Sequence, residues 1–91
     1  MKASEIPAGG GKIITEKKIV VTRDVNGDFH GFSAVCTHAG CIVSAIANGT
    51  IDCSCHGSKF DIATGKPVSG PARSSLPPVG VQQVGNYITV K

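Results

Sequence analysis

Hydrophobic and polar positions alternate with a period of two, or gather in short β-branched runs, along most of the chain. The segments with this pattern are residues 12–15, 18–23, 29–35, 49–53, 79–84 and 87–90. Such patterns are typical of β-strands. No amphipathic segment of helical length is found beside them. The pattern therefore predicts an all-β protein.

Turn-forming pairs separate several of the predicted strands. Asn26-Gly27, Asn48-Gly49 and Gly85-Asn86 each lie between strand-like runs. These residues tolerate the positive φ of tight hairpins, so neighbouring strands are expected to pair antiparallel. We predict an antiparallel β-sandwich of stacked sheets or a small barrel. Because the sequence shows no internal repeat or linker, residues 1–91 are expected to form a single domain.

Composition and charge limit the class of protein further. The chain has 91 residues, of which 41% are hydrophobic and four are cysteine, and a domain this small often depends on a disulfide or a metal. The net charge is +3 and the cations are scattered, so no nucleic-acid-binding surface is indicated. The apolar runs are far shorter than the roughly 20 residues that cross a bilayer. We expect no membrane span here, and a membrane anchor missing from this sequence remains a hypothesis.

The candidate chemistry lies in two short segments that follow predicted strands. Residues 36–41 read Cys-Thr-His-Ala-Gly-Cys, and residues 53–58 read Cys-Ser-Cys-His-Gly-Ser. Each segment supplies one thiolate and one imidazole that can converge on a metal, and each has one further cysteine. Because both follow strands, they are expected to form neighbouring loops on one scaffold.

The spacing within each segment selects the candidate ligands. Cys36 and His38 are two residues apart in a turn and can point the same way, while Cys53 and His56 are three apart and can close on one point. Adjacent Cys55 and His56 would chelate poorly. The predicted metal ligands are therefore Cys36, His38, Cys53 and His56.

The order of the ligands indicates which metal they bind. Zinc also accepts two thiolates and two imidazoles, so a zinc site stays open as an alternative. Common zinc fingers place both cysteines in one half and both histidines in the other, whereas here each loop contributes one of each. A binuclear iron centre explains this mixture, with one iron held by Cys36 and Cys53, the other by His38 and His56, and two bridging sulfides.

The remaining cysteines, Cys41 and Cys55, lie one on each loop. An even set with one spare cysteine on each loop favours a disulfide between them, and two buried free thiols are the alternative. Disulfides persist best in oxidising compartments. We therefore expect a soluble domain on a periplasmic or other extracytoplasmic face, released from a membrane anchor, with a cytoplasmic location left open.

The two motifs together resemble those of Rieske [2Fe–2S] proteins of the disulfide-containing type found in cytochrome bc and b6f complexes. The matching segments are residues 36–41, residues 53–58, Phe60-Asp61, Thr64-Gly65 and Gly70-Pro71-Ala72. The resemblance implies stacked antiparallel sheets with a small cluster-binding subdomain at one tip, and one [2Fe–2S] cluster per chain. It also implies that a proline-rich stretch at residues 65–78, including Gly70, Pro71 and Ala72, covers the cluster.

The resemblance further implies residues that tune the cluster. Ser58 matches a serine whose hydroxyl donates toward a bridging sulfide and raises the reduction potential. A hydroxyl bonded to nearby backbone is the alternative, and the position of Ser58 in the motif favours the tuning role. Gly57 lets backbone N–H groups approach the sulfides. Phe60 occupies the position where high-potential relatives often carry tyrosine, so an intermediate potential is expected.

The function implied by the resemblance is one-electron transfer between redox partners, such as a quinol-oxidising complex and a cytochrome. No nucleophile–base pair or substrate pocket is evident, so an electron carrier or oxidoreductase subunit is expected rather than an independent catalyst. The alternative is a Rieske-type ferredoxin, or a small Rieske subunit, that serves an oxygenase or the large subunit of another oxidoreductase. Ferredoxins of that kind usually lack the extra cysteine pair. A non-redox zinc module is the alternative from a different class.

Overall fold

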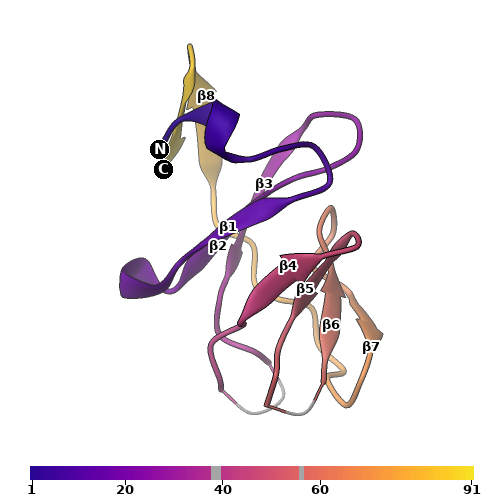
Figure 1. Cartoon of the computed structure of the whole chain (residues 1–91). Coiled ribbons are helices and arrows are strands. Elements are labelled where there is room, and N and C mark those ends of the chain that lie inside the picture. Colours follow the sequence, from indigo (N-terminus) through magenta and orange to yellow (C-terminus); the bar gives the residue numbers. More distant parts are fainter. Residues whose placement is uncertain (38–39, 56) are drawn as a thin grey trace.

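The computed structural model describes residues 1–37, 40–55 and 57–91. Within these ranges it contains strands in three antiparallel sheets and two short 3₁₀ helices (Figure 1). The elements are η1 (Ala3–Glu5), β1 (Gly11–Ile14), η2 (Thr15–Lys17), β2 (Ile19–Arg23), β3 (Phe29–Ser33), β4 (Ala45–Ala47), β5 (Thr50–Asp52), β6 (Lys59–Asp61), β7 (Pro67–Ser69), β8 (Val81–Val84) and β9 (Tyr87–Val90). The prediction of an antiparallel all-β fold is confirmed.

The first sheet has the order β1-β2-β3, with β2 at its centre. Val20 and Val21 are both fully buried, although they point to opposite faces of the strand. Val20 belongs to the core shared with the second sheet, and Val21 to a core with Ile6 and Ile88. Because both faces of β2 are covered, the strand reads as a continuous β-branched run and not as an alternating one.

The second sheet is a four-stranded meander with the order β4-β5-β6-β7. In Figure 1 it lies below the first sheet, and its strands run toward the end of the molecule where the cysteine-containing loops turn. Strand β7 forms within the proline-rich stretch at residues 65–78. It lies at the sheet edge, where Pro67 can be accommodated without a central ladder bond.

The third sheet is the hairpin β8-β9, which packs beside β3. The N-terminal residues pair with it, because Ala3 N–H donates to the Asn86 carbonyl and Ile88 N–H donates to the Met1 carbonyl, each at 2.8 Å. The two chain ends therefore lie together, at the end of the molecule away from the cysteine-containing loops (Figure 1). Within the described residues, no helix has the length and apolarity that a membrane crossing requires.

Candidate metal centre

Two loops at one end of the molecule carry the predicted ligands. The first loop, residues 36–41, follows β3, and the second loop, residues 53–58, connects β5 to β6. In the first loop, Cys36 N–H donates to the Cys41 carbonyl at 2.7 Å, and Gly40 N–H donates back to the Cys36 carbonyl at 2.9 Å. Gly40 has φ of 72°, in the left-handed region that favours glycine.

The second loop repeats the main-chain hydrogen bonds of the first. Cys53 N–H donates to the Ser58 carbonyl at 2.8 Å, and Gly57 N–H donates to the Cys53 carbonyl at 3.1 Å. Gly57 also has a positive φ, of 78°. Cys36 and Cys53 thus hold equivalent first positions in two loops of the same backbone design.

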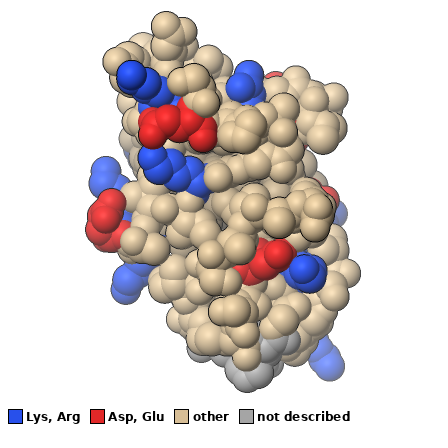
Figure 2. Space-filling view, viewed as in Figure 1, with Lys and Arg blue, Asp and Glu red and all other residues tan. Residues whose placement is uncertain are grey.

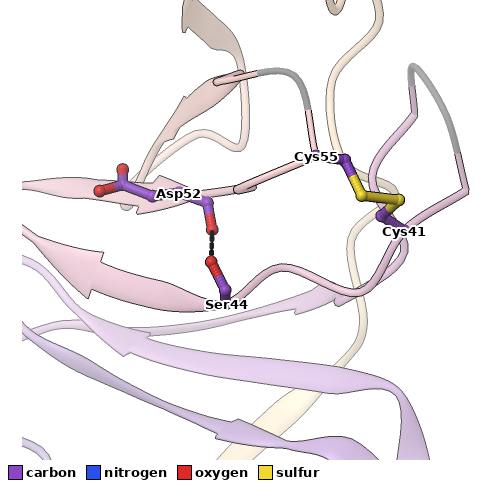
Figure 3. The surroundings of a disulfide bond; sticks show 4 residues. All are labelled: Cys41, Ser44, Asp52 and Cys55. Carbon is purple, nitrogen blue, oxygen red and sulfur yellow. Dashed lines mark hydrogen bonds between the residues drawn. A yellow bond between two sulfur atoms is a disulfide. The ribbon is translucent and has the colours of Figure 1, made fainter.

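A disulfide joins the two loops, as predicted. Cys41 and Cys55 are bonded, with 6.5 Å between their Cα atoms (Figure 3). Behind the bond, Ser44 donates to the Asp52 carbonyl through its N–H at 2.8 Å and its hydroxyl at 3.3 Å. Figure 3 shows this contact where the strands leave the loops. The loops are therefore linked covalently by the disulfide and by hydrogen bonds at their base.

The two predicted sulfur ligands are buried in one core. Cys36 and Cys53 are each 2% exposed, and both belong to the cluster that contains Ile51 and Phe60. The predicted imidazole ligands, His38 and His56, lie outside the described residues. Within residues 1–37, 40–55 and 57–91, no three His, Cys, Asp or Glu side chains are grouped to hold a metal ion.

The residues predicted to cover the site pack against the second loop. Ala72 N–H donates to Ser58 Oγ at 3.2 Å, and Ser58 is 1% exposed. Gly70 has φ of 86°, and a Cβ on it would lie 2.5 Å from Ser58 Cα and 2.7 Å from the Gly57 carbonyl oxygen. The main chain at Gly70 therefore approaches the second loop more closely than any other residue type allows.

A contact that sequence reasoning did not identify ties the same stretch to the first loop. Thr37 Oγ1 donates to the Ser74 carbonyl at 2.7 Å. The position of Thr37 directly after Cys36 was the available signal, but nothing in the sequence pointed to Ser74 as its partner. Through Ser58 and Thr37, residues 70–74 contact both loops.

The fold is all-β, and two loops with the same main-chain hydrogen bonds meet at one end of it. A disulfide joins these loops, and each begins at a buried cysteine. These features define a class of small β-domain that carries its candidate metal site at one end. Residues 1–84 match the family model described as the Rieske [2Fe-2S] domain. The chain therefore belongs to the Rieske [2Fe–2S] family. The cofactor of this family is a [2Fe–2S] cluster, and the chain is a Rieske-type electron-carrier domain.

Curated relatives are Rieske subunits of two kinds of cytochrome complex. The chain is 44% identical over 73 residues to the cytochrome b6-f complex iron-sulfur subunit of Chlorobaculum thiosulfatiphilum, which covers 77% of this chain and 39% of that protein. It is 45% identical over 67 residues to the cytochrome bc1 complex Rieske iron-sulfur subunit of Corynebacterium glutamicum, covering 68% and 16%. The chain thus spans well under half the length of these relatives.

Solved structures share the fold over most of the chain. The cyanobacterial plasma membrane Rieske protein of Synechocystis PCC 6803 has a TM-score of 0.65 and 32% identity, covering 85% of this chain and 89% of that chain. A chain from the complex of reduced oxygenase and oxidised ferredoxin in carbazole 1,9a-dioxygenase has a TM-score of 0.74 and 25% identity, covering 98% and 86%. The stacked antiparallel architecture is therefore that of Rieske proteins.

Proposed function

We propose that Cys36 and Cys53 bind one iron of a [2Fe–2S] cluster and that His38 and His56 bind the other. The observation that carries this proposal is the placement of Cys36 and Cys53, buried in one core and at equivalent positions of two loops with the same hydrogen bonds. Cysteine thiolates and histidine imidazoles are the donors of Rieske centres. When bound, the cluster supplies a one-electron couple in the range of roughly −150 to +300 mV.

The residues around the loops are proposed to tune the site and to exclude water. Ser58 Oγ accepts a hydrogen bond from Ala72 N–H, so this contact leaves the hydroxyl proton available to donate toward a sulfide. Gly70 carries no Cβ, and the close approach of its main chain to Ser58 depends on that absence. Gly57, whose φ is 78°, is proposed to let backbone N–H groups approach the sulfides. Residues 65–78, with Gly70, Pro71 and Ala72 against the second loop, serve as the cover of the site.

At the level of the whole protein, we propose electron transfer between a quinol-oxidising complex and a cytochrome. The curated relatives named above, subunits of cytochrome b6-f and bc1 complexes, support this role. The disulfide between Cys41 and Cys55 supports a location on an extracytoplasmic or periplasmic face, because disulfides persist in oxidising compartments. We propose that residues 1–91 act as a single domain in this role.

The second candidate function is electron delivery to an oxygenase or another oxidoreductase. It is favoured by the likeness to the chain in the oxygenase–ferredoxin complex, which extends over 98% of the sequence. The disulfide-forming pair Cys41 and Cys55 argues against it, because ferredoxins of this kind usually lack that pair.

The proposal is tested by chemical analysis, spectroscopy and one matched pair of histidine variants. Iron and acid-labile sulfide are expected in equal amounts, with a paramagnetic signal on reduction, whereas stoichiometric zinc would contradict the proposal. His56→Gln is expected to abolish the Rieske spectrum. His30→Gln is the control and is expected to leave the spectrum unchanged, because His30 lies in β3 and is bound to Asp24. A potentiometric titration then separates the candidates, since a potential at the low end of the Rieske range would favour the oxygenase partner.

A further inference from the structure

The cover stretch and the two loops carry positive charge without any carboxylate. Residues 36–41, 53–58 and 65–78 contain Lys66 and Arg73 but no Asp or Glu. In Figure 2 the lower end of the molecule shows blue but no red side chains below the paired charges at mid-height. Lys66 lies at the turn between β6 and β7, at the opposite end of β6 from the second loop. Arg73 is therefore the cation of these segments beside the loops, and no carboxylate of these segments would repel an acidic partner there.

The two carboxylates in the strands of the second sheet, Asp52 and Asp61, already have partners. Asp52 Oδ2 lies 3.4 Å from Lys59 Nζ. Asp61 Oδ1 accepts the N–H groups of Ala63 at 2.7 Å and Thr64 at 3.2 Å. Neither carboxylate pairs with Arg73, which is exposed and has no ion-pair partner among the described residues.

Arg73 lines a surface hollow beside both loops. The hollow has a volume of about 510 Å³, and the residues that line it are Thr37, Gly70, Pro71, Arg73 and Ser74. One wall belongs to the first loop through Thr37, whose hydroxyl is bound to the Ser74 carbonyl. Another wall contains Gly70, whose main chain touches the second loop. A group bound in the hollow would thus contact the first loop, through Thr37, and residues 70–74, which pack against the second loop.

We propose that this hollow docks an acidic surface of a redox partner protein, with Arg73 receiving a partner carboxylate. A guanidinium presents a planar set of donors that matches a carboxylate, and it keeps its charge at all physiological pH values. Complementary charge raises the rate of encounter and fixes the orientation of the docked partner. The inference rests on the proposed electron-transfer function and adds the chemistry of the partner and the face on which it docks.

The experiment uses the cluster-containing protein and two soluble c-type cytochromes as probes, one acidic and one basic. Binding and the second-order rate of electron transfer are measured at about 0.01 M and about 0.1 M salt, where charges are screened beyond about 30 Å and 10 Å. Arg73→Glu is the test variant. Lys91→Glu is the matched control, since it makes the same change of net charge at the C-terminus, away from the loops (Figure 1).

The expected loss of rate is confined to the acidic probe and is largest at low salt. Arg73→Glu should lower the rate with the acidic cytochrome about ten-fold at low salt, and weaken its binding by a similar factor. Lys91→Glu should change either quantity less than about two-fold. With the basic cytochrome, Arg73→Glu should raise the rate.

Other outcomes separate the docking face from the function. If Arg73→Glu and Lys91→Glu change the binding of the acidic cytochrome equally, the docking proposal is wrong. It is also wrong if sodium acetate displaces the acidic cytochrome equally well from the original protein and from Arg73→Glu. If the acidic cytochrome binds through Arg73 but receives no electron, the docking face stands and the electron-transfer function fails. The reduction potential of Arg73→Glu, measured alongside, shows whether the cluster itself has been altered.

Discussion

Thr22 and Ile62 connect the two larger sheets across the main core. Thr22 Oγ1, in β2, donates to the Ile62 carbonyl, just beyond β6, at a distance of 2.6 Å. Thr22 is fully buried, so this bond satisfies a hydroxyl and a carbonyl that water does not reach. It fixes the sheet that carries the loops relative to the sheet that supports it.

Replacing Thr22 by valine should destabilise the fold without changing its shape. Valine has nearly the same outline and suits a strand, but it leaves the Ile62 carbonyl without this donor. We expect a loss of about 1–3 kcal/mol in the free energy of unfolding, measured by denaturant titration. Thr89→Val is the control, because its hydroxyl is exposed and makes a bond of 3.5 Å. Equal losses in the two variants would contradict the prediction.

Gly70→Ala should disturb the contact between the cover stretch and the second loop. The new Cβ would lie 2.5 Å from Ser58 Cα, at a residue whose φ is 86°, so the main chain must move. Gly49→Ala is the matched control, because Gly49 has φ of 79° but nothing within 4 Å of its Cβ position. We expect a cost of about 1 kcal/mol in the control and a larger one in Gly70→Ala.

Cluster retention gives a second measurement for the Gly70 prediction. The rate at which the visible absorbance is lost during storage should rise in Gly70→Ala and stay near the original value in Gly49→Ala. Equal rates in the two variants would mean that the contact with Ser58 does not protect the site.

Phe60→Tyr should raise the reduction potential. Phe60 is fully buried in the core that contains Cys36 and Cys53, so an added hydroxyl is placed in the core that holds the proposed ligand sulfurs. A hydrogen bond worth about 1 kcal/mol more in the reduced state corresponds to about 40 mV for a one-electron couple. Potentiometric titration measures the shift. Phe29→Tyr, beside Arg23 in the first sheet, is the control, and an unchanged potential in folded Phe60→Tyr would refute the prediction.

Removing the disulfide should weaken the fold and release the cluster more readily. Cys41 and Cys55 are separated by 14 residues, and closing a loop of about 15 residues stabilises a protein by about 3 kcal/mol in the chain-entropy model. The double variant Cys41→Ser/Cys55→Ser should lose stability of this order in denaturant titrations. Reduction of the original protein should reproduce the loss, whereas reductant should leave the double variant unaffected.

Asp24 is expected to titrate below its usual range. A hydrogen bond from His30, at 2.8 Å, is the main cause, and the N–H groups of Asp28 and Asn26 add to it, so the pKa of the carboxyl is lowered from its usual value of 3.8. Because the pKa is lowered in the folded state, the ionised carboxylate stabilises the fold above pH 3.8. This contribution is lost as the pH falls through the lowered pKa. Carboxyl chemical shifts followed by NMR give the pKa directly.

Two variants of His30 separate the causes of the Asp24 shift. His30→Phe removes the donor and should move the pKa of Asp24 toward 3.8. His30→Gln keeps an N–H donor and should retain more of the shift. A pKa of Asp24 that is the same in all three proteins would show that the backbone donors alone are responsible.

Five of the six strands that the sequence predicted have four or five residues, and β5, with three, is the exception. Strands β4, β6 and β7 also have three residues each, too few for alternation to stand out. They form by pairing with β5 and with one another. The loops were predictable because cysteine and histidine have few roles at such spacing. Contacts such as Thr37 with Ser74, 37 residues apart, depend on tertiary packing and leave no mark in either segment.

The pairing of the N-terminal residues with β9 has a practical consequence. Because Met1 and Lys91 lie at the same end of the molecule, away from the loops (Figure 1), a linker at either end would present the same face outward. Protein immobilised on an electrode through its first or its last residue should therefore exchange current with dissolved partners in the same orientation.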